Sequence, residues 1–203
     1  MASLGGFLTR LINGKMAAEI QLDVVEAVSV QNDSTLVSQL NAHQDAQSKD
    51  DPLAVFRTTL AGGDKGKGHD IFYEHQGAQC TRCHAIFEYG GNAGPVLDGV
   101  ASRLSDEQLL SALVTPSAEY AEGYEIVVLD LKDGTSVSGT VLERTTALIK
   151  LKIGKEDIRS ISQAEIKSST SVPSSMIAQG TILNKKEIRD LITFLKTLKK
   201  KES

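Results

Sequence analysis

Apolar residues recur with the 3.6-residue period of a helix near the middle of the chain and at its end. Leucine and valine residues follow Ser105 and Gln108, which stand three apart as the two members of a capping box do. Asn184 and Glu187 have the same spacing ahead of a second apolar stripe over 188–198. Both segments are predicted to be amphipathic helices, and their stripes are predicted to form core rather than a cofactor site.

The pattern changes in residues 123–167, where apolar and polar positions alternate as they do in half-buried strands. Turn residues at 133–134 and 154–155 divide this stretch into short runs, the last of which covers 158–166. Four strands are predicted, and they are expected to form a small antiparallel sheet inserted between helical parts.

Short helices are also predicted ahead of the middle region. Residues 17–30 place their apolar side chains on one helical face, and 34–42 and 52–60 give two more short helices. The polar stretch 43–51 is predicted to separate these two. The first sixty residues resemble a helical hairpin and carry no candidate catalytic or ligand-binding residues.

Composition narrows the class of protein. The chain has 203 residues, of which 40% are hydrophobic and 24% charged, as in ordinary globular proteins. No apolar run approaches the roughly 18 residues of a membrane span. A net charge of −4 and an aromatic content of 4% argue against a nucleic-acid partner. We therefore expect a globular protein with neither a membrane span nor a nucleic-acid site.

The only two cysteines, Cys80 and Cys83, precede His84 in the sequence CTRCH. A structural zinc site needs four ligands, and no second cysteine or histidine pair supplies the rest. A thioredoxin-like dithiol follows a buried strand, whereas a short helix is predicted over 64–76. In a covalent haem site, the two thiols add to the porphyrin vinyl groups and the histidine binds the iron. The motif therefore predicts one covalently bound haem c.

The residues after the motif suggest how such a group would be held. Pro95 follows a glycine in an extended turn, and its carbonyl is predicted to accept a hydrogen bond from Nδ1–H of His84. Leu97 and Val100 are predicted to line the haem face. Arg103 is either a partner for a haem propionate or a solvated surface charge.

A second axial ligand is also needed for a six-coordinate iron. Met176 is the one methionine that follows the motif, and it lies in a Pro/Ser loop just ahead of a helix. A lone methionine is usually core filler, but the loop favours iron ligation. His43, His69 and His75 are the alternatives, and Met16 is a further one.

Eight segments carry a resemblance to a known family. They are GGD (62–64), IF (71–72), CTRCH (80–84), GNAGPVLDGVASR (91–103), TPSAEYAEGYE (115–125), DGTSVSGTVLE (133–143), SSM (174–176) and EIRDLITFLKTL (187–198). On these segments, residues 52–198 resemble the C-terminal haem c domain of the large membrane-associated or periplasmic dehydrogenases of planctomycetes and verrucomicrobia.

The resemblance implies a fold class and a domain organisation. The fold would be mainly α, with a class I-like cytochrome c helical domain over 52–122 and 168–203. The small antiparallel sheet of 123–167 would be inserted in that domain. Residues 1–51 would be a helical segment, the end of the helical repeats that precede the cytochrome in that family.

The resemblance also implies roles for individual residues. Cys80 and Cys83 would be the thioether anchors, His84 the proximal iron ligand and Met176 the distal one. The family usually has proline after the distal methionine, whereas Ile177 stands there in this chain.

Two functions follow as expectations. The first is a mono-haem c-type cytochrome that is no enzyme itself and transfers electrons from a fused or partner dehydrogenase to a downstream acceptor. The second is a haem protein with a labile sixth ligand, acting as a gas sensor or weak peroxidase.

Haem c is attached outside the cytoplasm, which predicts a periplasmic, exported protein. The inserted strands are either a spacer or a docking face for the redox partner.

Overall fold

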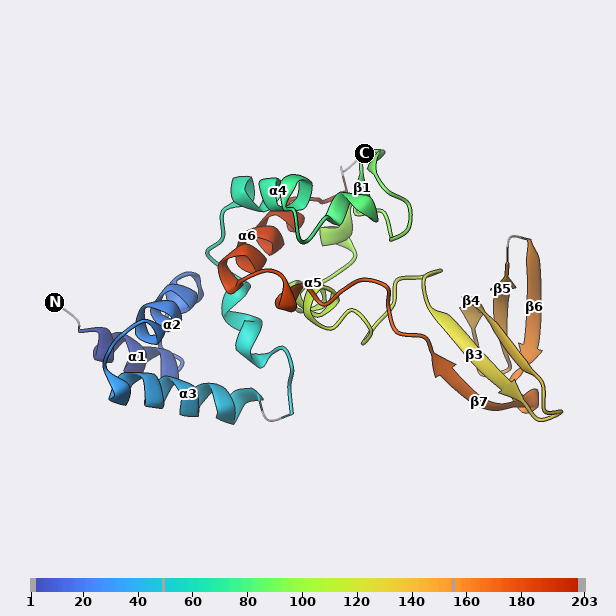
Figure 1. The fold of residues 1–203 in the computed structure, drawn as a ribbon, viewed down its shortest axis with the longest axis horizontal. Coiled ribbons are helices and arrows are strands. Elements are labelled where there is room, and N and C mark those ends of the chain that lie inside the picture. Colours follow the sequence, from blue (N-terminus) through green and yellow to red (C-terminus); the bar gives the residue numbers. More distant parts are fainter. Residues whose placement is uncertain (1–2, 49, 155, 201–203) are drawn as a thin grey trace. The chain divides into compact units, whose positions relative to one another are not determined.

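A computed structural model describes residues 3–48, 50–154 and 156–200 of the chain. Lys155, which belongs to one predicted turn, lies outside these residues, as does Met1. The chain divides into two compact units, which are described separately (Figure 1). We call residues 1–115 with 178–203 the helical unit and residues 116–177 the sheet unit.

The helical unit contains the α-helices and a hairpin of two short strands, with short 3-10 turns between them (Figure 1). Its elements are α1 (Leu4–Ile12), α2 (Gln21–Ser29), α3 (Ser34–Ser48), α4 (Lys65–Glu74), β1 (Ala85–Ile86), β2 (Tyr89–Gly90), α5 (Asp106–Val114) and α6 (Lys185–Leu195). The capping boxes predicted at Ser105 and at Asn184 are both present, and the helices that they begin are confirmed. Local side-chain signals therefore set the starts of α5 and α6.

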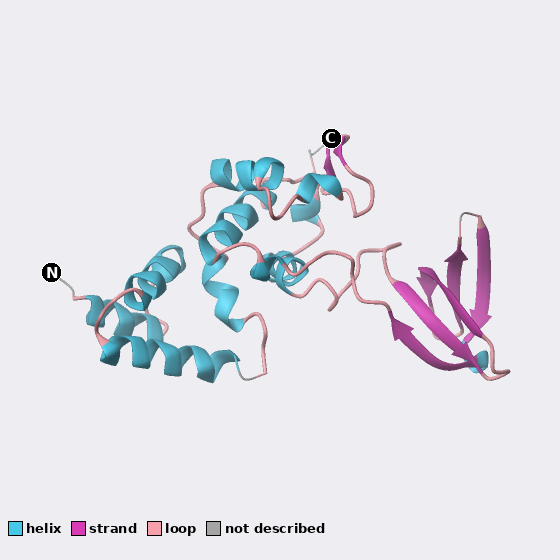
Figure 2. Cartoon of the chain, in the orientation of Figure 1, coloured by secondary structure: helices cyan, strands magenta, loops and turns pink. Residues whose placement is uncertain are grey.

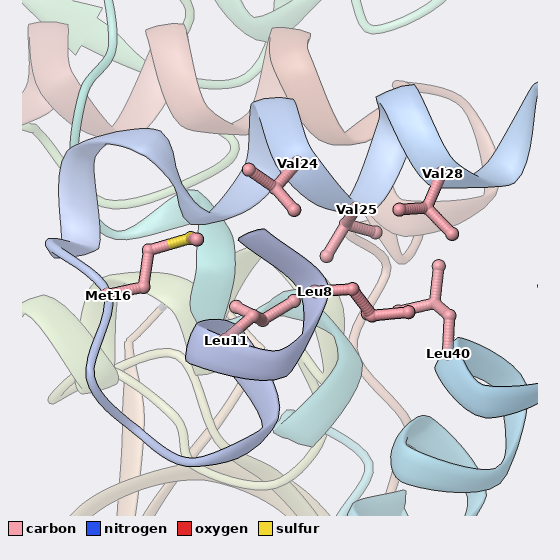
Figure 3. Packing of buried hydrophobic residues seen from close by; sticks show 7 residues of the cluster. All are labelled: Leu8, Leu11, Met16, Val24, Val25, Val28 and Leu40. Atoms are coloured by element: carbon pink, nitrogen blue, oxygen red, sulfur yellow. The ribbon is translucent and has the colours of Figure 1, made fainter. Parts of the chain in front are cut away.

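The first three helices pack around a core of their own, shown in Figure 3. Its buried side chains are Leu8, Leu11, Met16, Val24, Val25, Val28 and Leu40. Two sequence predictions differ from this arrangement, and helix α1 was not predicted. Helix α3 continues to Ser48 through the predicted polar linker 43–51, and the helix predicted over 52–60 is a 3-10 helix over 54–59. The polar residues after position 42 are largely an exposed helix face rather than a loop.

Helices α4 and α6 form the second core of the helical unit. Phe72 of α4 and Ile188, Leu191 and Ile192 of α6 are each no more than 2% exposed. The two backbones approach so closely that a Cβ atom on Gly68 would lie 2.0 Å from the carbonyl oxygen of Asp190. Glycine is therefore required where the helices cross.

The sheet unit is built from five antiparallel strands in the order β6-β5-β4-β3-β7. The strands are β3 (Ile126–Leu131), β4 (Ser136–Arg144), β5 (Leu148–Ile153), β6 (Asp157–Ser162) and β7 (Ile166–Ser171). In the described part of this unit the one helical element is the 3-10 turn Gln163–Glu165 (Figure 2). Val127, Leu129 and Leu151 are nevertheless fully buried, so the sheet curves around its own core.

The predicted fold class, a mainly α cytochrome c-like fold with a small inserted sheet, is wrong. Helices make up 43% of the described residues, and the sheet is a substantial unit with its own core. The strand predicted over 158–166 is in fact two strands, because Ser162 and Glu165 form a capping box that turns the chain. The extra strand, β7, then returns to pair with β3.

None of the helices in residues 3–48, 50–154 and 156–200 combines the length and the apolar character needed to cross a membrane.

Candidate functional site

The CTRCH sequence forms one tight turn shortly after α4 ends. Residues Cys80–Arg82 make a 3-10 turn, and the backbone N–H of His84 donates to the carbonyl oxygen of Cys80 at 2.9 Å. Gln79, just before the turn, has a φ of 47°. A helix and a loop precede the cysteines, which is not the strand-to-helix setting of a thioredoxin-like dithiol.

Both cysteines are free thiols, Cys80 half-buried and Cys83 exposed. Burial raises the pKa of the Cys80 thiol to about 11, so this thiol is protonated at neutral pH. An activated nucleophile needs a lowered pKa, and the Cys80 thiol has the opposite. Within the described ranges, no three His, Cys, Asp or Glu side chains gather closely enough to hold a metal ion among themselves.

The ring of His84 is held in one tautomer. Its Nδ1 lies 2.8 Å from the carbonyl oxygen of Pro95, and a carbonyl can only accept, so Nδ1 carries the hydrogen. The predicted hydrogen bond is therefore confirmed. In the neutral ring the lone pair is then on Nε2, which is the state in which histidine binds a metal. A Cβ atom on Gly94 would lie 2.7 Å from Cε1 of this ring, so glycine is needed where the backbone lies against the imidazole.

The loop after Pro95 is braced by a side chain. Arg103 donates hydrogen bonds to the carbonyl oxygens of Val96 and Asp98, a role that neither interpretation of this residue had included. The backbone N–H of Leu97 donates to Ala85 at 2.9 Å, and the Leu97 side chain is half-buried. Val100, at the end of this loop, is 4% exposed.

Strands β1 and β2 form a hairpin that begins immediately after His84 and was not predicted. Its two-residue turn, Phe87 and Glu88, has φ values of 48° and 67°, the left-handed region that asparagine and glycine favour. The Asp98 carboxylate accepts from the backbone N–H of Phe87 at 3.0 Å. The Phe87 and Tyr89 side chains are 74% and 67% exposed. The turn carries no sequence signal, because Phe-Glu is an unusual choice there.

The four alternatives to Met176 as second iron ligand each have contacts of another kind. Nδ1 of His75 accepts from two backbone N–H groups. His69 contacts the ring of Tyr73 in a tilted arrangement and that of Phe194 edge-on, with centroids 4.6 and 5.5 Å away. His43 lines a cavity of about 410 Å³ beside α3. Met16 belongs to the core of the first three helices (Figure 3).

Met176 belongs to the sheet unit, and its side chain is half-buried. Its backbone N–H donates to Oγ of Ser174 at 3.2 Å. The same loop is tied back twice, since the N–H of Ser174 donates to Oγ of Ser117 at 3.0 Å and Oη of Tyr120 donates to the carbonyl of Val172 at 2.9 Å. The predicted role of Met176 rests on the sequence and on this local structure.

A scan against protein-family models and a search of curated proteins found no match for this chain. The resemblance to the haem c domains of dehydrogenases therefore stays a prediction.

Proposed function

We propose that this chain is a mono-haem c-type electron-transfer protein. The observation that carries the proposal is the hydrogen bond from Nδ1 of His84 to the Pro95 carbonyl, which leaves Nε2 free to bind a metal directly after a Cys-x-x-Cys pair. When bound, haem supplies an iron that gains and loses one electron. In this proposal the chain itself is no enzyme.

The residues of the CTRCH turn and the loop after it, in the helical unit, fit such a group. Cys80 and Cys83 would hold it through thioether bonds, with His84 as the proximal iron ligand. The resemblance gives Met176, which belongs to the sheet unit, as the distal ligand. The two cysteine thiols are free, as bond formation to the vinyl groups requires. Gly94 gives the His84 ring space, and the Pro95 carbonyl fixes its orientation. A preset ligand needs little rearrangement on electron transfer, which is what the function demands.

Other residues of the loop would support the group. Leu97 and Val100 would supply apolar contact, and Arg103, which braces the loop through two carbonyls, keeps further N–H donors that a propionate can use. The resemblance further suggests a periplasmic location, a dehydrogenase as donor and a separate acceptor. If Met176 fills the sixth position, as the resemblance implies, electron transfer is favoured over a gas sensor or weak peroxidase.

Purification from a host that matures haem c tests the proposal. The wild-type chain is expected to keep its colour through acid–acetone extraction, with one haem per chain. The double variant Cys80→Ser, Cys83→Ser should yield colourless protein, while Ser138→Ala, an exposed change on β4, should leave the haem content unchanged. A colourless wild-type chain would refute covalent haem.

Met176 is tested separately in the oxidised protein. Met/His haems show a weak far-red sulfur-to-iron band. Met176→Ala should abolish this band and allow imidazole or cyanide to bind readily. If the spectrum of the variant is unchanged, a histidine or Met16 takes the role.

A further inference from the structure

We propose that His75 is the positioning residue of the loop that presents Cys80 for haem attachment. The inference rests on the proposed function, since it concerns the same cysteine. Nδ1 of His75 accepts hydrogen bonds from the backbone N–H groups of Gly77 at 3.1 Å and Ala78 at 3.0 Å. The side chain is 26% exposed, so the ring lies mostly within the protein.

The loop 75–79 needs this acceptor because α4 ends at Glu74. Beyond the end of the helix the chain leaves the helical path, and the N–H groups of Gly77 and Ala78 donate to the His75 ring instead of to carbonyls of α4. The His75 carbonyl also accepts from the N–H of Gln79 at 3.1 Å. His75 thus accepts from three of the four backbone N–H groups of 76–79, and Gln79 then leads with its left-handed φ into the turn that begins at Cys80.

The opposite side of the ring faces the start of α6. Because Nδ1 accepts, the hydrogen is on Nε2. Oε1 of Glu187, which belongs to the capping box that begins α6, lies 3.7 Å from Nε2, beyond hydrogen-bond distance. The acceptor state of Nδ1 is therefore shown by its two backbone donors alone.

The two histidines near the motif are consequently held in opposite tautomers. Nδ1 of His84 donates, which frees Nε2 for iron, whereas Nδ1 of His75 accepts, which orders the backbone. His75 acts on haem attachment through the loop and not by contact with iron.

Amide hydrogen exchange on the haem-free chain tests the loop directly. His75→Leu removes the acceptor, and exchange at Gly77 and Ala78 should speed up about fivefold for each lost bond. His75→Asn should stay within about twofold of the wild type, because asparagine Oδ1 bonds N–H groups two and three residues ahead in the same way. His69→Leu and His69→Asn, in the preceding helix α4, are the matched controls and should leave both amides unchanged.

Haem content, measured after expression in a maturing host, gives the second readout. His75→Leu should lower the covalently bound fraction about fivefold, and His75→Asn should restore it. Unchanged exchange at Gly77 and Ala78 in the leucine variant overturns the inference. So does equally fast exchange in the asparagine variant, which decides alone if the leucine variant does not fold. A colourless wild-type chain whose amides respond as described refutes the proposed function instead, since the loop result is obtained without haem.

Discussion

The sheet unit and the segment 75–103 of the helical unit are ordered by different means. Six strand residues of the sheet unit bury their side chains against one another, and Val127, Leu129 and Leu151 have no exposed surface. In 75–103 the residues that matter for the site, Cys80 and His84, are only half-buried. There backbone–backbone hydrogen bonds are joined by bonds that single side chains make, those of His75, His84 and Arg103. Burial is shared among many contacts, whereas a loop held by one acceptor depends on that residue alone.

The largest effect is expected in the core of the sheet unit. Leu129→Ala should destabilise this unit by about 3 kcal/mol, because the side chain is fully buried and its neighbours cannot close the cavity. Urea unfolding followed by NMR signals of the β3–β5 amides measures this loss. Ser138→Ala, which is exposed on β4, should change little. A small effect of Leu129→Ala would show that the sheet does not hold its own core.

In the segment 75–103, the Cys80 thiol tests the effect of burial. The pKa of this thiol rises from 9.0 to about 11, so at pH 8 the folded chain holds about a hundredfold less Cys80 thiolate than the unfolded chain. Iodoacetamide should therefore label Cys80 about a hundredfold faster in urea than in buffer. The contribution to stability is complete below pH 9 and is lost as the pH rises through about 11, because the unfolded thiol ionises first. Equal labelling rates in both states would contradict the burial.

Gly94→Ala tests how strongly the structure of the segment 75–103 depends on one residue. The added Cβ would lie 2.7 Å from Cε1 of His84, so the ring must move and the bond to Pro95 should be lost, at a cost of about 2 kcal/mol. The nitrogen-bound ring proton of His84, observed by NMR in the haem-free chain, should disappear. Gly6→Ala in α1 is the control, since its nearest neighbour is Oγ of Ser3 at 3.6 Å. A retained proton signal in the Gly94 variant would mean that the loop yields instead.

The smallest effect is a gain. Replacing Phe87 and Glu88 with Asn-Gly should stabilise the helical unit by about 1 kcal/mol, because the turn needs positive φ at both positions. Little packing is lost, as Phe87 is 74% exposed. Thermal unfolding measures the gain, and an Ala-Ala variant, which keeps the unfavourable φ angles, should show none. No difference between the two variants would argue against a strained turn.

The sequence predicted best what depends on neighbouring residues. The capping boxes at Ser105 and Asn184 depend on side chains three residues apart, and both were correct. The bond from His84 to Pro95 was predictable because a Gly-Pro pair turns the chain close to the motif. The prediction failed at Ser162 and Glu165. Their capping-box spacing was present, but the isoleucines on either side were interpreted as one strand.

Other features depend on contacts that sequence does not reveal. Helix α1 contains two glycines, which lower its helix propensity, and packing with α2 and α3 compensates. The hairpin after His84 has a turn that no propensity favours. The loop closed by His75 and the bracing by Arg103 join residues through side-chain to backbone bonds whose geometry only the fold determines.

The pairing of β7 with β3 has a consequence for how such a chain can be assembled. The N–H of Val172 donates to the carbonyl of Ile126 at 2.8 Å, so the sheet unit starts and finishes at neighbouring points. Tyr120 and Ser117 join the incoming and outgoing segments just outside the strands. A module with adjacent ends can be spliced into a host loop, exchanged or circularly permuted without pulling the host apart. The five strands thus form a portable cassette, in which evolution or an engineer can vary the exposed strand faces while the host sequence on either side stays unchanged.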